Sequence, residues 1–235
     1  MPNLGLGVQA TKSGVVLASH VTDNLKMLHR YNTGSVVPVS DGAAAFDGSS
    51  DHIQLGSAIS HNTISISSWI YVVNDATSKT ILDTRDADND GIYFWIDSSE
   101  NLFLYINSSD SGGSDASITP NAWTHVAGTY DGTNMKLYVN GALMITQADA
   151  GSSETVSTTT APRIGKSAYT NANWFNGYMS NVGVWSGVLT QAQIKSIMWK
   201  NYAGLTDSEK TNLVSWWNLS ADANDSHGSN NGTLS

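Results

Sequence analysis

The stretch DADNDGIYFWID has the residue types and the spacing of a calcium-binding loop. Asp86, Asp88 and Asp90 alternate along it, a glycine follows, and Asp97 stands at the twelfth position. Ca²⁺ prefers oxygen ligands, and carboxylates on alternate residues of a glycine-containing loop can surround the ion. The flanking segments are typical of strands rather than of the helices of an EF-hand, so a polar hairpin turn is the alternative interpretation.

Groups suited to catalysis are scarce. The three glutamates, Glu100, Glu154 and Glu209, are isolated from one another, and the sequence contains no GxSxG or HExxH motif. A glycosidase needs two carboxylates about 5 to 9.5 Å apart, and only the DADND turn clusters acids. His125, in WTHVAG, has no evident catalytic partner, so we assign it to hydrogen bonding within a sheet. We therefore expect no enzyme.

The composition favours an all-β protein of one sizeable domain. The 235 residues are 40% hydrophobic but only 13% charged, and aspartate far outnumbers glutamate. The net charge of −9 argues against nucleic acid and anionic membranes as partners. No apolar run is long enough for a transmembrane helix, and the start lacks a signal-peptide pattern. The absence of cysteine excludes disulfides and zinc-thiolate sites.

Short segments of alternating hydrophobicity, separated by Gly, Asn and Asp turns, predict a β-sandwich. One face of each segment is aliphatic and should form the core between the sheets. The residues predicted to face this core are Ile64, Ile66, Ile70 and Val72, then Ile92, Phe94 and Ile96, then Leu102, Leu104 and Ile106, and finally Met135, Leu137 and Val139.

Two short helices are predicted near the C-terminus. Thr190 with Gln193, and Thr206 with Glu209, have the spacing of a capping box. A last strand is expected over Leu213–Leu219, followed by a polar tail. Residues 1–42 show no strong periodicity, and we interpret them as an extended arm with one or two short strands. A disordered leader is the alternative interpretation of that segment.

Four stretches carry a resemblance to a known family. They are AAAFDGSSDHIQLG, ISISSWIYV, ITPNAWTHVAGTYDGTNMKLYVNGALM and PRIGKSAYTNANWFNGYMSNVGVWSGVLTQAQI, and their order covers roughly residues 43–200. Together they resemble the laminin-G-like branch of the concanavalin A-like jelly rolls. The resemblance implies a jelly-roll sandwich of two antiparallel sheets over residues 43–235, with one or two short helices near the C-terminus.

The resemblance also gives expectations for particular segments. SWWNLSADANDSHGSNNGTL is similar to the segment that usually begins such domains, so the strand and tail over 213–235 should complete the sandwich in cis or be exchanged with another subunit. Because the family often binds Ca²⁺ near such a loop, Asp222 and Asp225 form a second candidate site. Trp123, Trp174 and Trp185 look like the family's packing positions. The Glu-x-Asp-x-Glu strand of glycosidases on this fold is absent.

The face opposite the aliphatic one is rich in aromatic residues and poor in charge. Sugars stack on such rings, and partner subunits also bury them. The alternative is that the chain's own arm or the other sheet covers part of this aromatic face. The candidate ligand or interface residues are Trp69, Tyr71, Tyr93, Trp95, Phe103, Tyr105 and Tyr138.

Two functions follow from these observations. The leader VTDNLKMLHRYNTGSVVPVSDGAAAFDGS is similar to leaders of laminin-G-like virion proteins of tailed phages. The main prediction is therefore a non-enzymatic capsid-decoration or other virion-surface subunit that contacts itself or other virion proteins through the arm and the C-terminal strand. The alternative is a secreted or cell-surface carbohydrate-binding module, with Ca²⁺ as its one candidate cofactor.

Overall fold

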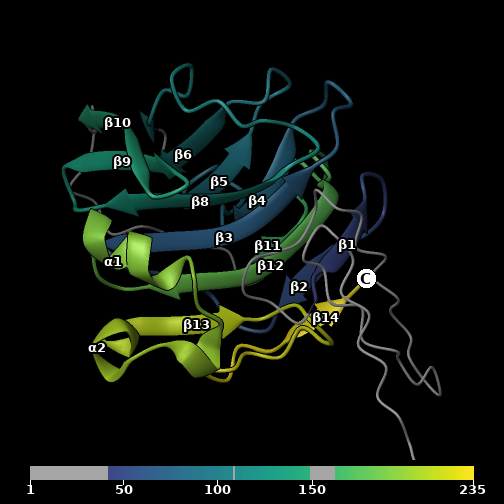
Figure 1. Ribbon diagram of the computed structural model, residues 1–235. Coiled ribbons are helices and arrows are strands. Elements are labelled where there is room, and N and C mark those ends of the chain that lie inside the picture. The colour runs from purple at the N-terminus through teal and green to yellow at the C-terminus, as the bar shows by residue number, and fades with distance from the viewer. Residues whose placement is uncertain (1–41, 108, 149–161) are drawn as a thin grey trace, which may run out of the picture. The chain divides into compact units, whose positions relative to one another are not determined.

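The computed structural model describes residues 42–107, 109–148 and 162–235, so the predicted arm lies, apart from Gly42, outside the described residues. Two antiparallel sheets face each other, which confirms the expected sandwich (Figure 1). The first sheet has the order β1 (Ala44–Asp47), β12 (Asn176–Trp185), β3 (Ile64–Val72), β8 (Trp123–Tyr130), β9 (Asn134–Val139) and β10 (Ala142–Ala148), and β13 (Leu213–Trp217) also pairs with β12. The second sheet has the order β14 (Gly232–Leu234), β2 (Ile53–Leu55), β11 (Arg163–Ile164), β4 (Lys79–Asp83), β5 (Ile92–Ile96), β6 (Leu102–Ile106) and β7 (Ser109–Asp110).

The core lies between the two sheets and consists of the aliphatic faces that the alternation predicts. In β5, for example, Ile92, Phe94 and Ile96 are fully buried in it. The inward residues of β3, β6 and β9 join the same cluster. Because successive side chains of a strand point to opposite faces, the aromatic residues between them must lie on the outer faces of the sheets.

Two short helices, α1 (Gln191–Ile197) and α2 (Asp207–Lys210), and a 3₁₀ turn (Tyr202–Gly204) follow β12 (Figure 1). Both predicted capping boxes are present, at Thr190 and at Thr206. Ile194 and Ile197 of α1 pack against Tyr138 on the outer face of the first sheet. This face is therefore partly covered by the chain itself.

The C-terminal segment completes both sheets of the same chain. β13 pairs with β12 in the first sheet, and β14 pairs with β2 in the second. Trp217 is fully buried in the core, and its indole Nε1 donates to the carbonyl of Asn230 at 2.9 Å. The sequence left open whether this segment pairs in cis or is exchanged between subunits. In the structure it pairs in cis.

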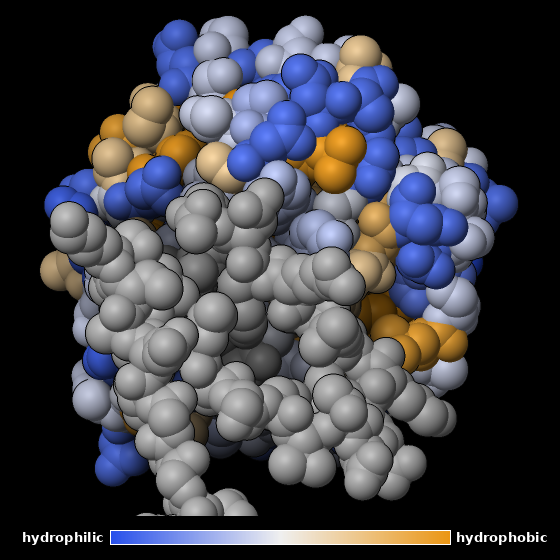
Figure 2. Space-filling view, turned by 45° about the vertical axis from the view of Figure 1, so that its right-hand side comes forward, coloured by the Kyte–Doolittle hydropathy of each residue, from blue (hydrophilic) through white to orange (hydrophobic). Residues whose placement is uncertain are grey.

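Among the residues that Figure 2 colours, the hydrophobic ones form small groups separated by hydrophilic ones. The large apolar side chains that are most exposed are Trp199, at 54%, and Leu234, at 66%. Within the described residues, no helix has the length and apolarity needed to cross a membrane.

Trp217→Ala should lower the free energy of unfolding by about 3–5 kcal/mol, because it leaves a large cavity in the core and an unpaired carbonyl. Urea denaturation followed by circular dichroism measures this change. The matched control is Trp199→Ala, which removes the same side chain from an exposed position and should cost less than about 1 kcal/mol. Equal effects of the two substitutions would contradict the burial of Trp217 in the core.

Glu209 of α2 is held to the C-terminal end of α1 by a partly buried ion pair with Lys200 and a hydrogen bond from Ser196. Its carboxylate accepts from Lys200 Nζ at 2.6 and 2.8 Å, from Ser196 Oγ at 2.6 Å and from the cap residue Thr206. Burial alone would raise the pKa of Glu209, but these hydrogen bonds outweigh it and hold the pKa at about 2, below its ordinary value of 4.5. The ion pair therefore stabilises the fold at pH values above 4.5.

Since the folded-state pKa is the lower one, the stabilisation should be lost as the pH falls from about 4.5 to about 2. Glu209→Gln should lower stability at neutral pH and make stability fall less steeply over this interval. Denaturation midpoints measured at several pH values give both slopes. Asp207→Asn, at an exposed neighbouring position, is the control and should keep the wild-type slope in this range.

Candidate functional site

The four predicted calcium ligands do not form one site. Asp86 lies in the hairpin before β5, where its Oδ1 accepts from the backbone N–H groups of Asp88 and Asp90. Asp97 lies beyond the other end of β5. A strand rises about 3.3 Å per residue, so the length of β5 separates the hairpin from Asp97 by roughly 16 Å. In the described parts of the chain, no three His, Cys, Asp or Glu side chains are grouped to hold a metal. Calcium binding by the hairpin alone stays a prediction.

The second candidate, in the tail, is a structural turn. The carboxylate of Asp225 accepts from the backbone N–H groups of Trp216, His227, Gly228 and Asn230 at 3.0–3.1 Å. Burial alone would raise the pKa of Asp225, but the hydrogen bonds have the larger combined effect, so the pKa lies below its ordinary value. Asp222 is exposed and binds Asn224. The oxygens of Asp225 are therefore occupied by the protein's own backbone.

The predicted aromatic residues lie on two different outer faces. Trp69, Tyr71 and Tyr138 belong to the first sheet, where Trp69 and Tyr138 are buried and Trp69 Nε1 donates to the carbonyl of Met198. Tyr71 contacts Trp123 and Tyr178 at ring centroid distances of 5.9 and 5.7 Å. The grouping of all seven residues as one surface is therefore wrong.

His125 lies next to Trp69 on the first sheet, with ring centroids 5.5 Å apart. It is buried, and burial lowers its pKa to about 3, so the ring is neutral. Its Nδ1 has no hydrogen-bond partner. The backbone N–H of His125 donates to Asn140 Oδ1, whereas Nδ1 of the ring does not make the hydrogen bond within the sheet that we expected.

The other four aromatic residues lie on the outer face of the second sheet, and three of them form a stacked column. Tyr93 stacks on Trp95 with centroids 5.2 Å apart and planes at 4°, and Trp95 stacks on Phe103 at 4.9 Å and 23°. The guanidinium of Arg85 caps the column 3.7 Å from the Tyr93 centroid. At the other end, any side chain at Gly113 would collide with Phe103. Because these ring faces cover one another, the column acts as a scaffold rather than as a sugar platform.

A buried ion pair anchors this column to a neighbouring loop. Asp83 is fully buried and accepts from Arg85 Nε at 3.0 Å and Arg85 Nη2 at 2.7 Å. The same carboxylate accepts from the hydroxyl of Ser167 at 2.9 Å and the backbone N–H of Ala168 at 3.0 Å. Asn173 also donates to the hydroxyl of Tyr93 at 2.9 Å. The loop 165–175 is therefore held firmly against the second sheet.

This loop presents a mixed aromatic and polar surface, which we call the loop face. Tyr169 is 44% exposed, and Trp174 packs edge-on against His52 at 5.7 Å. Cross-strand pairing of β2, β11 and β4 brings Gln54 and Arg163 beside it, and Arg163 Nε donates to Gln54 Oε1 at 3.1 Å. The loop face consists of His52, Gln54, Arg163, Lys166, Tyr169 and Trp174. An exposed ring, Tyr169, and a half-buried ring, Trp174, next to hydrogen-bonding side chains suit a polar ligand with apolar ring faces.

Most residues of the loop face were not predicted from the sequence. Trp174 was assigned to packing, and Arg163, Lys166 and Tyr169 were quoted only within the motif PRIGKSAYTNANW. The sign that distinguishes this stretch is its two basic and two aromatic residues within twelve positions of a chain of low charge. By contrast, Trp185 is fully buried, as a packing residue should be.

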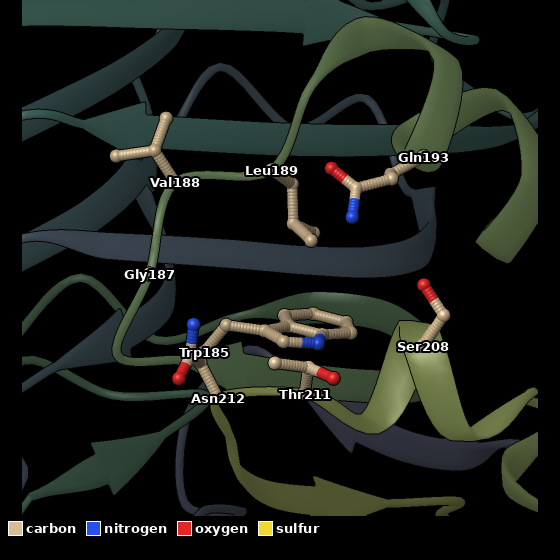
Figure 3. A pocket seen from close by; sticks show the side chains of 8 residues that line it. All are labelled: Trp185, Gly187, Val188, Leu189, Gln193, Ser208, Thr211 and Asn212. Atoms are coloured by element: carbon tan, nitrogen blue, oxygen red, sulfur yellow. The ribbon is translucent and has the colours of Figure 1, made fainter.

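A separate pocket of about 190 Å³ lies between the β12–α1 connection and α2 (Figure 3). Trp185, Gln193 and Ser208 are among its lining residues, none of which is titratable. The indole Nε1 of Trp185 already donates to the carbonyl of Glu209 at 2.8 Å. The pocket therefore offers neither charge recognition nor acid–base chemistry.

Asp83→Asn should destabilise the protein by about 3–5 kcal/mol, because it leaves the buried Arg85 without a counter-charge. The substitution should also release the loop 165–175, which near-ultraviolet circular dichroism of the aromatic column can detect. Asp88→Asn, in the exposed hairpin, is the control and should change stability by less than about 0.5 kcal/mol. A stable Asp83→Asn protein with an unchanged aromatic spectrum would contradict the anchoring role.

The family comparison agrees with the sandwich. A model of the Concanavalin A-like lectin/glucanases superfamily (Laminin_G_3) matches residues 47–195. Pappalysin-1 of Mus musculus is 38% identical over 85 residues, which are 35% of this chain and 5% of that protein. The chain thus spans only a small part of the length of this curated relative.

Similar solved structures include a Bacteroides ovatus protein that is itself proposed to bind carbohydrate, with a TM-score of 0.67 and 21% identity over 82% of this chain and 57% of that one. The heptameric SAP-like pentraxin of Limulus polyphemus has a TM-score of 0.56 and 18% identity, over 66% of this chain and 80% of its own. The CBM40 of the Ruminococcus gnavus IT-sialidase, solved with α2,3-sialyllactose, has a TM-score of 0.51 and 14% identity, over 68% of this chain and 99% of its own. At these identities the similarity shows the fold alone.

Proposed function

Because the chain belongs to the concanavalin A-like lectin/glucanases superfamily, we propose that it is a non-catalytic carbohydrate-binding module whose loop face contacts a glycan. The observation behind this proposal is the firmly anchored loop 165–175, which places Tyr169 and Trp174 beside polar side chains. Two similar structures with a TM-score above 0.5 have descriptions that mention carbohydrate, and this supports the same class of ligand.

The chemistry of the loop face favours binding over hydrolysis. Asp83, the carboxylate next to the loop, is fully buried and accepts hydrogen bonds from Arg85, Ser167 and Ala168. A carboxylate occupied in this way is not available to a substrate, and a glycosidase needs two carboxylates that flank the scissile bond. We therefore assign the protein a binding role, and infer a secreted or cell-surface location where glycans are accessible.

The virion-surface role stays a prediction. It depends on the predicted arm, which lies outside the described residues, and on exchange of the C-terminal strand, which the structure pairs in cis. None of the proteins named above is described as a virion component. A decoration subunit that also binds glycans would be compatible with the proposal.

The double variant Tyr169→Ala/Trp174→Ala should weaken glycan binding by about tenfold or more, because each ring buries apolar area that a sugar would cover. A glycan array with the full-length protein identifies the ligand, and titration calorimetry then measures the affinities. Both are performed with Ca²⁺ and with a chelator, to test the expected calcium dependence.

The matched control is Tyr178→Ala/Trp199→Ala, which removes the same residue types from exposed positions in β12 of the first sheet and in the turn after α1, where Trp199 contacts Trp69 of that sheet. It should leave glycan affinity unchanged. Loss of binding in this control and not in the loop variant would place the ligand on the first sheet and overturn the proposed site. Absence of binding to any glycan would overturn the function itself.

A further inference from the structure

Three basic side chains gather on the loop face. Lys166 Nζ lies 4.0 Å from the ring centroid of Trp174, and the same ring contacts His52. Arg163 is two residues before the loop's first turn and extends from β11 on the same face as Gln54. The chain as a whole has a net charge of −9, so the two positive charges of Arg163 and Lys166 run against its overall composition.

Neither Arg163 nor Lys166 has a carboxylate within salt-bridge distance among the described residues. The ion pairs of that part of the chain involve Lys79, Arg85 and Lys200 instead. The nearest buried carboxylate, Asp83, is already paired with Arg85. The positive charge of the loop face is therefore not neutralised by the protein itself.

Hydrogen bonds orient Arg163 but leave part of its guanidinium unused. Its Nε donates to Gln54 Oε1 and its Nη1 to the carbonyl of Ser167, both at 3.1 Å. These two hydrogen bonds fix the plane of the guanidinium group. The N–H groups of Nη2 can then donate to another acceptor. Lys166 is only 7% exposed, and its Nζ makes a cation–π contact with Trp174 but no hydrogen bond to the described protein atoms.

The arrangement stores electrostatic repulsion that an anion would relieve. Burial lowers the pKa of Lys166, and the charge of Arg163 lowers it further. Burial likewise lowers the pKa of His52, and the charges of Lys166 and Arg163 lower it further. The hydrogen bond with the carbonyl of Ser50, and to a smaller extent the charge of Asp51, partly offset this lowering of the pKa. A purely structural role for these cations would be expected to pair them with acids, as the protein does for Arg85.

We propose that the loop face selects glycans that bear an anionic group, a carboxylate or a sulfate, which Arg163 and Lys166 bind while Trp174 and Tyr169 contact the sugar ring. The planar fork of Arg163 matches two oxygens of such a group, and Lys166 adds a point charge beside it. The inference rests on the proposed carbohydrate-binding function and names its ligand class.

The test compares three probes with the full-length protein. They are hyaluronan, whose only anionic groups are carboxylates, dextran sulfate, and neutral dextran. Binding to at least one anionic polymer, weakening as salt is raised, together with little binding to neutral dextran, is the expected result. Preference between the first two probes tells whether a carboxylate or a sulfate is the natural group.

The variants Arg163→Gln and Lys166→Gln should each weaken binding to the preferred anionic polymer by about tenfold, since each removes a charge-assisted contact. Arg163→Lys keeps the positive charge but lacks the planar guanidinium. Its affinity for the polymer should therefore lie between that of the two Gln variants and that of the wild type. Lys195→Gln, an exposed lysine on α1, makes the same change in net charge and should bind like the wild type. Thermal melts confirm that each variant is folded.

Other outcomes separate the two proposals. Equal binding to neutral and anionic polymers, or no loss of binding in Arg163→Gln and Lys166→Gln, would overturn the selectivity while leaving carbohydrate binding intact. An equal loss in Lys195→Gln would show a general charge effect and overturn it as well. No binding to any polymer or array glycan would overturn the carbohydrate-binding function, and the selectivity with it.

Discussion

The carboxylate of Asp225 holds the turn through which one segment of the chain reaches both sheets. It accepts hydrogen bonds from four backbone N–H groups, including that of Trp216 in β13 and that of Asn230 just before β14. The turn is so tight that a side chain at Gly228 would collide with the carboxylate. β13 can then bury Trp217 between the sheets, while β14 pairs with β2. Sandwich closure therefore depends on satisfying these backbone donors at one point.

Asp83 plays a comparable part for the loop face. It is a second buried carboxylate whose oxygens are shared between a side chain, Arg85, and the loop 165–175. Arg85 in turn caps the stacked column of Tyr93, Trp95 and Phe103. One ion pair thus connects β4, the aromatic column and a loop more than eighty residues later in the chain. In both places the oxygens of a buried acid accept from the protein's own donors, and one of the two acids, Asp225, was a metal-ligand candidate in the sequence.

The sandwich, the inward faces of its strands and the two helix caps could be predicted, because each depends on local alternation or on residues three positions apart. The candidate site could not, since it depends on contacts between distant segments. Nothing near Tyr138 in the sequence indicates that α1 covers it, and nothing near Asp83 indicates that Ser167 binds it. The alternating acids of DADND are compatible with a metal loop as well as with a hairpin turn, because the distinction depends on where Asp97 lies after β5.

The stacked column has a consequence for how such a protein can diversify. The rings of the column cover one another and stabilise the packing of β5 on β6. The exposed side chains of the loop face lie on a different segment, the loop 165–175. Asp83 holds that segment mainly through the hydroxyl of Ser167 and the main chain at Ala168, and therefore constrains its position without constraining the side chains at 169 and 174. Substitutions there can change what is recognised while the framework stays intact, so specificity and folding are free to evolve separately.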